Sequence, residues 1–219
     1  MPKVTVRDGV ASVAAFDFDG TLTRGDSLLP FLARGLGWPR LALALAQNAP
    51  WLLAYALRVV PNHIAKARLL HHTLGDRTQA ELEEWTRQWL ARDLPSQWNP
   101  WALAQLQAHQ QAGRCCVMVS ASPDVYLTRV AEQLGFDALI CTEMEVRGRG
   151  VDAHLTGRMR TPNCHGTQKT QRLQAWLNQQ LGTGDVAYRL HSAYGDTQGD
   201  WPMLALAEQA WYRGQRVQK

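Results

Sequence analysis

The sequence predicts an α/β protein, with a Rossmann-like parallel sheet core covered by helices and an inserted all-helical cap domain. Short apolar strand patterns alternate with helical patterns along most of the chain, which favours a parallel sheet with helices on its faces. The stretch from Ser27 to about Trp98 contains no convincing strand and is too long for a simple crossover. We therefore expect a catalytic core formed by residues 1–26 and 99–219, and a helical cap formed by residues 27–98.

The predicted strands are short apolar runs bounded by turn residues or polar residues. The first, Ala11 to Phe16, precedes Asp17-Phe18-Asp19, and Gly20 then lets the chain turn away. The remaining predicted strands cover residues 115–120, 137–142 and 186–196.

Helices are predicted from the spacing of apolar residues and from end signals. The segment "AELEEWTRQWLARDL" repeats apolar residues at helical spacing, and "PWALAQLQAHQQAG" has Pro100 near its start. In "ASPDVYLTRVAEQLG" we expect Ser122 as the N-cap and Pro123 at the first helical position. The segment "TQKTQRLQAWLNQQLG" predicts a helix that ends at Gly182 and carries Lys169 in its first turn.

Composition limits the function classes. The chain has 219 residues, of which 46% are hydrophobic and 19% charged, so it is globular and long enough for one ordinary domain with an insertion. The net charge is only +4, and no basic stripe with interleaved aromatic residues is present, so we expect no nucleic-acid partner. The mild positive balance suits an anionic substrate or an anionic membrane surface. No oligomeric state is predicted.

Four cysteines show neither zinc-ligand spacing nor a disulfide framework, which favours a reducing compartment. The first ten residues are mixed and polar and carry no secretory signal. We therefore expect a cytoplasmic protein, with association at the inner face of the cell membrane as an open alternative.

That alternative comes from the segment Leu41 to Val60, which nearly reaches the ~20 apolar residues needed to span a bilayer. Gln47, Asn48, Pro50 and Arg58 interrupt it. Pro50 is expected to break or kink a helix, and Arg58 is costly in a membrane. We favour a helical hairpin packed on its own domain over a segment that lies on the membrane surface.

Carboxylates follow the first and last predicted strands. Asp17 and Asp19 end the first, while Asp196 and Asp200 lie in "GDTQGDWP" after the last. Ligands of open α/β sheets bind at the carboxyl ends of strands, where these acids would meet. A surface turn is the alternative for Asp17 and Asp19, because Asp-Gly is a common turn sequence. For Asp196 and Asp200 the alternative is that they are loop acids or a helix cap.

Lys169 and Ser120 complete this set of candidate residues. A cation in the first turn of a helix is disfavoured by the helix dipole, so Lys169 is expected to have a partner elsewhere. The helix predicted after Ser120 would offer free N–H groups to an anion. Acids alone would repel a phosphate, so we expect a metal ion to offset them, and oxygen ligands suit magnesium.

Four motifs occur in order between Phe16 and about Leu204: "DFDGTLT", "VMVSAS", "QK" within a helix, and "YGDTQGDWPML". In these motifs the chain resembles the haloacid dehalogenase superfamily of aspartate-nucleophile phosphatases. The resemblance implies a magnesium-dependent phosphate monoester hydrolase that acts through an aspartyl-phosphate.

The resemblance also implies a role for each acid. Asp17 would be the nucleophile, and Asp19 would protonate the leaving group and then activate water. Mg²⁺ would be held by Asp17, the backbone carbonyl of Asp19, and Asp196. Asp200 would support the metal site or orient Lys169. Ser120 and Lys169 would bind the phosphoryl oxygens.

Two branches of the superfamily are similar to this chain. The helical insertion resembles the phosphoserine-phosphatase-like subgroup, in which Asp26 would occupy the place of an acid that faces substrate. That subgroup usually carries Ser-Gly-Gly where this chain has "SAS", and Asn where it has Gly199. The C-type phosphatidylglycerophosphatases are similar in "FDFDGTLTRGDSLLPFL", "GRMRTPNCHGTQK" and "LHSAYGDTQGDWPML", and in having an apolar segment early in the cap.

The substrate therefore has two alternatives. It is a lipid phosphate such as phosphatidylglycerophosphate, or a small soluble phosphate monoester. A non-catalytic binding protein on the same fold is a third, weaker alternative, because Asp17, Asp19, Lys169 and Asp196 are all present.

Overall fold

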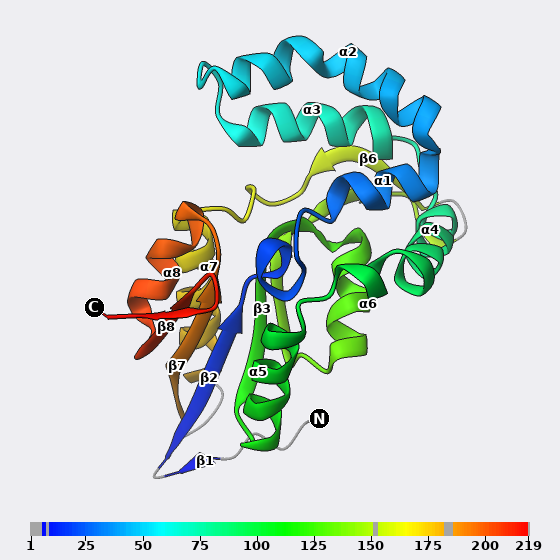
Figure 1. The fold of residues 1–219 in the computed structure, drawn as a ribbon. Coiled ribbons are helices and arrows are strands. Elements are labelled where there is room, and N and C mark those ends of the chain that lie inside the picture. The colour runs from blue at the N-terminus through cyan, green and yellow to red at the C-terminus, as the bar shows by residue number, and fades with distance from the viewer. Residues whose placement is uncertain (1–5, 8, 151–152, 182–185, 219) are drawn as a thin grey trace.

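The structure is a computed structural model, and it describes residues 6–7, 9–150, 153–181 and 186–218. Within these residues the main sheet has the strand order β4-β3-β2-β7-β8-β9, with β1 paired to β2 (Figure 1). The pairings that join β4, β3, β2, β7 and β8 are parallel, whereas β1 and β9 are antiparallel to their neighbours. The strands are β1 (Val6–Arg7), β2 (Val10–Phe16), β3 (Cys115–Pro123), β4 (Ala138–Thr142), β7 (Ala187–Gly195), β8 (Gln209–Tyr212) and β9 (Gln215–Val217).

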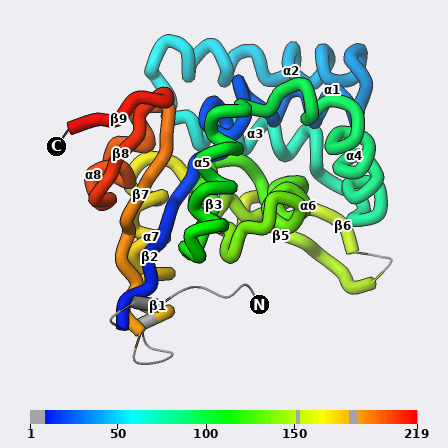
Figure 2. The backbone as a smooth tube through the Cα atoms, turned by 60° about the horizontal axis from the view of Figure 1, so that its bottom comes forward, coloured from blue at the N-terminus to red at the C-terminus, as the bar shows by residue number. Residues whose placement is uncertain are grey.

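Helices cover both faces of this sheet, as predicted (Figures 1 and 2). Because strand side chains alternate, Ala14 and Phe16 of β2 join one apolar cluster, whereas Val13 and Ala15 join another. The first cluster includes residues of α5 and α6, and the second includes residues of α7 and α8. These helices are α5 (Pro100–Gln111), α6 (Asp124–Leu134), α7 (Thr167–Leu181) and α8 (Trp201–Leu206). Gly182, the predicted end of α7, lies outside the described residues.

Residues 27–98, all of which the structure describes, form helices and contain no strand. The helices are α1 (Leu28–Leu36), α2 (Trp38–Ala56), α3 (Asn62–Leu74) and α4 (Gln79–Arg92), followed by a short 3₁₀ turn. Figure 1 shows α1, α2 and α3 beyond the carboxyl ends of β2 and β3. The division into core and cap domains stays a prediction.

The chain leaves and re-enters the core at one place. Thr23 and Trp98 form an antiparallel bridge, and the Arg24 N–H donates to the Gln97 carbonyl at 2.7 Å. The helices of this segment also share an apolar cluster with the core: Phe31 of α1 and Trp89 of α4 both contact Tyr126 of α6. Packing therefore fixes α1 and α4 against α6.

A two-stranded antiparallel sheet, β5 (Met144–Arg147) with β6 (His154–Met159), was not predicted from the sequence. Both strands are short and partly exposed, so they lack a continuous apolar run. β6 lies beside α3 (Figure 1). Gly157 has a φ of 73°, and a Cβ there would lie 2.7 Å from the Cα of His71, so glycine permits this close approach.

Residues 41–60 supply most of the first helix and the turn of a helical hairpin, whose second helix is α3. Of the break or kink predicted at Pro50, the break does not occur, because α2 continues through Pro50 to Ala56. Pro50 and Ala46, whose carbonyl loses its partner to the proline, are both exposed, so water can satisfy that carbonyl. Among the described residues no helix is long and apolar enough to cross a membrane.

Candidate active site

Asp17 and Lys169 form a buried ion pair at the carboxyl end of the sheet. Asp17 directly follows β2, is 5% exposed, and donates its backbone N–H to the Tyr194 carbonyl of β7 at 3.0 Å. Lys169 lies in the first turn of α7, and its Nζ is 2.6 Å from Asp17 Oδ1 and 2.5 Å from Asp200 Oδ1. Two carboxylates thus offset the unfavourable position of this cation on its helix.

Asp200 is fully buried, and hydrogen bonds engage both of its carboxylate oxygens. Oδ1 binds Lys169, while Oδ2 accepts from the backbone N–H groups of Asp196 and Thr197 at 3.2 and 2.9 Å and from Thr197 Oγ1 at 2.8 Å. Asp200 therefore holds the Lys169 ammonium group in place, and its support of a metal site stays a prediction.

Asp17, Asp196 and Asp200 form an acidic cluster, with one oxygen of each within 4.8 Å of the others. Three carboxylates face the single ammonium group of Lys169, which leaves an excess of two negative charges if all are ionised. Gly20 makes the approach of Asp196 feasible, because a Cβ on Gly20 would lie 2.1 Å from Asp196 Oδ2. A hard divalent cation suits both this charge and these oxygen donors.

Burial dominates the electrostatics of this cluster. Burial raises the pKa of Asp17 to about 8, against the opposing effect of Lys169. Burial also disfavours the charged form of Lys169, but Asp17 and Asp200 outweigh it and raise its pKa. For Asp200, burial is outweighed by Lys169 and the Thr197 donors, so the pKa is lowered. An added cation beside Asp17 would favour its ionised form.

Asp19 is held separately from this cluster. Its Oδ1 accepts from the Ser27 N–H at 2.8 Å, and its Oδ2 accepts a short hydrogen bond from Ser122 Oγ. Burial raises the pKa of Asp19, and the charge of Asp26 adds to this rise. A raised pKa is what a carboxyl group needs to act as an acid. No pattern in the sequence predicted that Ser27 and Ser122 would hold Asp19.

Ser120 is fully buried within β3, three residues before the strand ends, and lines the same cavity as Asp17 and Lys169. The prediction that Ser122 caps a helix with Pro123 at its first position is wrong. β3 stays extended through Pro123, and α6 begins at Asp124. Ser122 instead donates its N–H to Ser120 Oγ at 3.1 Å and its hydroxyl to Asp19. The helix N-terminus therefore does not directly follow Ser120.

A cavity of about 710 Å³ opens above these residues. Asp17, Asp19, Ser120 and Lys169 line it. We call these four residues the floor, together with Asp196 and Asp200, which lie beside Asp17 without lining the cavity. Helices α1 to α3 supply an apolar wall, made of Leu28, Leu29, Leu45, Leu52, Tyr55, Ala65 and Leu69. We call these residues the wall.

Asp26 also lines the cavity, as predicted for a residue that faces substrate. Its Oδ1 accepts from the N–H groups of Leu28 and Leu29 at 3.1 and 3.3 Å, so it also caps the start of α1. Its role toward a substrate stays a prediction.

Among the polar lining residues that sequence reasoning missed are Lys66, Asn163 and His165. Lys66 lies on α3, and the other two lie in the loop before α7. A Cβ on Gly199 would lie 2.5 Å from His165 Nε2, so the imidazole fills the space beside this glycine. The sequence around Lys66 predicts a helix, and nothing in it indicates that this lysine lines a cavity.

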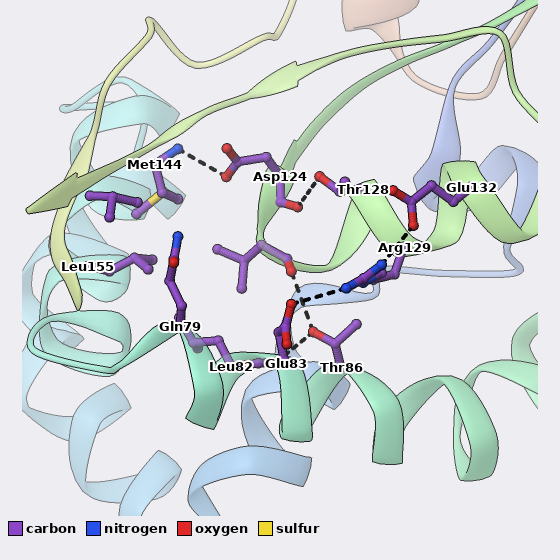
Figure 3. Close-up of a pocket in the computed structure, with 12 residues that line it drawn as sticks. Gln79, Leu82, Glu83, Thr86, Asp124, Thr128, Arg129, Glu132, Met144 and Leu155 are labelled. Carbon is purple, nitrogen blue, oxygen red and sulfur yellow. Dashed lines mark hydrogen bonds and ion pairs between the residues drawn. The ribbon is translucent and has the colours of Figure 1, made fainter. Parts of the chain in front are cut away.

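A second cavity, of about 360 Å³, lies between α4, α6 and the β5–β6 sheet (Figure 3). None of the predicted site residues lines it. Arg129 pairs with Glu83 and Glu132, and Asp124 accepts from the Met144 N–H at 3.0 Å. Since these charged groups already have partners, we assign the chemistry to the first cavity.

The structure thus combines a parallel sheet with buried acids and a lysine at its carboxyl edge. Residues 14–205 match the family model for haloacid dehalogenase-like hydrolases, and the chain belongs to this family. It is an enzyme of the phosphatase class, so the alternative of a non-catalytic binding protein is set aside.

Two curated relatives and one solved structure illustrate the similarity. Protein CicA of Caulobacter vibrioides is 35% identical over 201 residues, which cover 92% of this chain and 85% of that protein. A histidinol-phosphatase of Neisseria meningitidis is 28% identical over 203 residues, covering 90% of this chain and 88% of the relative. A phosphoserine phosphatase in its apo form shares the fold, with a TM-score of 0.61, 16% identity, and coverage of 92% and 86%.

Proposed function

We propose that the protein is a magnesium-dependent phosphate monoester hydrolase that forms an aspartyl-phosphate on Asp17. One observation carries the proposal: Asp17 is buried at a strand end, paired with Lys169, and faces a cavity that Asp19 also lines. A carboxylate held in this way is positioned to act as a nucleophile.

The two aspartates divide the chemistry. An Asp17 oxygen attacks phosphorus while the bond to the leaving oxygen breaks, and Asp19 gives its proton to that oxygen. Water then attacks the aspartyl-phosphate, Asp19 takes a proton from it, and inorganic phosphate leaves with Asp17 regenerated. Ser120 and Lys169 bind the phosphoryl oxygens, and Asp200 keeps Lys169 in place.

Asp17, the backbone carbonyl of Asp19, and Asp196 would hold Mg²⁺. When bound, the ion would offset the excess negative charge of the cluster and polarise the phosphoryl group. Asp200 supports this arrangement by accepting the backbone N–H of Asp196.

For the substrate we propose a lipid phosphate, such as phosphatidylglycerophosphate. The wall supports this proposal, because its leucines would pack against an apolar leaving group above a phosphoryl group on the floor. The second candidate is a small soluble phosphate monoester. It is favoured by the histidinol-phosphatase relative and by the carboxylate of Asp26 in the cavity.

We further propose that α2 binds peripherally to the anionic inner surface of the cell membrane. Large apolar side chains on α2 and the turn after it are exposed: Leu43 and Leu53 by 60%, Leu57 by 65% and Val59 by 73%. No acidic residue occurs between Asp26 and Asp76, whereas Arg40 and Arg58 are exposed in this segment. Apolar residues with nearby cations suit the surface of an anionic bilayer.

A screen of phosphate monoesters with and without magnesium tests these proposals. It would include phosphatidylglycerophosphate in detergent, histidinol phosphate, phosphoserine and a simple alkyl phosphate. A preference for the lipid supports the lipid proposal, and a preference for an amino-alcohol phosphate overturns it in favour of the second candidate. Absence of turnover on all esters with magnesium would overturn the proposed reaction.

A further inference from the structure

Lys66 is a cation that α3 supplies to the cavity. Its Nζ donates to the carbonyl of Ala121 at 2.6 Å and to Asn163 Oδ1 at 3.4 Å. Ala121 lies between Ser120 and Ser122 at the end of β3, so the lysine reaches from the helical segment to the edge of the floor. Lys66 therefore connects the helical segment 27–98 with strand β3 of the main sheet.

The hydrogen bonds of Lys66 differ from those of Lys169. Lys169 is paired with two carboxylates, whereas no carboxylate of the described residues lies within ion-pair distance of Lys66. An ammonium group has three N–H bonds, and the two described acceptors of Lys66 are neutral and leave one N–H for a ligand. Asp19 and Asp26 line the same cavity and act on Lys66 electrostatically, but neither forms an ion pair with it. A positive charge next to a cavity and without a directly paired anion is suited to bind an anion.

The position of Lys66 indicates which part of a substrate it would contact. The phosphoryl group would lie on the floor beside Asp17 and Lys169, so the leaving group would extend toward α3 and the wall. Asn62 and Leu69, which are one turn away from Lys66 on α3, line the cavity as well. This face of α3 thus lies along the expected path of the leaving group.

We propose that Lys66 is a specificity-determining residue that binds a second anionic group, a carboxylate or a phosphodiester, in the leaving group of the substrate. The inference rests on the proposed function, because it takes the phosphoryl group to be bound at Asp17. It predicts a preference for esters with this second anion over uncharged alkyl esters. It also disfavours substrates whose leaving group is only cationic.

Steady-state kinetics on matched esters tests the inference. The probes are butyl phosphate, an analogue whose terminal methyl is replaced by a carboxylate, and one with a terminal methyl phosphodiester. Lys66→Met should raise KM for both anionic esters by about tenfold more than for butyl phosphate, since a charge-assisted hydrogen bond is lost. The two anionic probes show which chemistry Lys66 prefers.

Three further variants separate charge from structure. Lys66→Gln keeps an N–H donor for Ala121 and Asn163 but removes the charge, so it should show the same selective loss even if Lys66→Met folds poorly. Lys66→Arg should restore most of the preference. Arg68→Met is the matched control: Arg68 is also on α3, but it is exposed and stacks on Trp51 outside the cavity lining.

The inference is overturned if Lys66→Met and Lys66→Gln change KM equally for the charged and uncharged esters. Calorimetry with the corresponding non-hydrolysable phosphonates separates its failure from that of the proposed function. Lys66-dependent binding of the anionic phosphonates without turnover of any ester would retain the anion subsite and reject the phosphatase mechanism. Equally tight binding of phosphonates with and without the second anion would reject the subsite.

Discussion

The floor and the wall of the cavity differ in the forces that hold them. On the floor, Asp17, Lys169 and Asp200 are buried, and the Lys169 Nζ lies 2.6 Å from Asp17 Oδ1 and 2.5 Å from Asp200 Oδ1, so each charge depends on a specific partner. On the wall, α1 to α3 contribute mainly leucines, whose packing has no fixed direction. The floor is therefore suited to position a reaction, and the wall to accept an apolar substrate of variable shape.

This difference also predicts different sensitivity to substitution. Removing one partner of a buried charge pair leaves the other charge uncompensated, which costs about 3–5 kcal/mol. Replacing one half-buried leucine by another apolar side chain of similar volume costs less than about 1.5 kcal/mol. Variants of the floor should thus impair catalysis, metal affinity or stability, whereas variants of the wall should shift substrate preference.

The largest effect is expected for Asp17→Asn. The amide has nearly the same shape but cannot attack phosphorus, so kcat should fall by at least about 10⁴-fold. Phosphate release and circular dichroism would be measured on the purified variant. The control is Asp76→Asn, which makes the same change at an exposed aspartate distant in sequence from Asp17. Activity within tenfold of the wild type would refute the assignment of Asp17 as the nucleophile.

Asp19→Asn should have the next largest effect, and the effect should depend on the leaving group. General acid catalysis contributes about 10²–10⁴-fold for a poor leaving group. We expect such a loss with an alkyl phosphate and a much smaller one with p-nitrophenyl phosphate, whose leaving oxygen needs no proton. Equal losses on both esters would show that Asp19 is not the acid.

Asp196 and Asp200 should respond differently, although both follow β7. Asp196→Asn should raise the magnesium concentration for half-maximal activity by at least about tenfold, because it removes a proposed ligand. Asp200→Asn should mainly lower stability, by about 3 kcal/mol, since Lys169 and the 196–197 backbone lose a buried charged acceptor. Magnesium titration and thermal melts measure the two effects. A shared metal defect with unchanged stability would make Asp200 a direct ligand instead.

A chelator test examines the metal proposal itself. Activity should disappear with excess EDTA and return with magnesium, while calcium should inhibit because it prefers more ligands at longer distances. Full activity in the chelator would contradict the metal-dependent mechanism.

The sequence predicted the floor better than the wall. Apolar runs ending in Asp17, Ser120 and Asp196 predicted that these residues lie at the carboxyl edge of a parallel sheet. In the structure Asp17 and Ser120 line one cavity, and Asp196 lies beside Asp17. The unfavourable helix position of Lys169 predicted a partner, which is the Asp17–Asp200 pair. Local patterns are sufficient when strand ends converge on one edge.

Residues placed by tertiary packing were not predicted. Lys66 reaches Ala121 only because α3 lies across the end of β3, and a helical pattern does not specify that contact. Ser122 was assigned to a helix cap from its neighbour Pro123, but its hydroxyl binds Asp19 instead. The β5–β6 sheet was missed because its short strands are partly exposed.

The smallest expected effect concerns the outer face of α2 and its proposed membrane contact. Leu43→Glu with Leu53→Glu places charges on two exposed leucines that do not line the cavity. Burying a leucine contributes about 1.5–3 kcal/mol, so co-sedimentation with anionic vesicles should weaken by at least about tenfold. Turnover of a soluble ester should stay the same, and wild-type vesicle binding should weaken as salt rises. Gln107→Glu with Gln111→Glu on α5 adds the same charge at exposed positions of a helix that packs on the sheet. If both double variants bind vesicles like the wild type, or if the wild type does not bind, the exposed leucines of α2 do not contact a membrane.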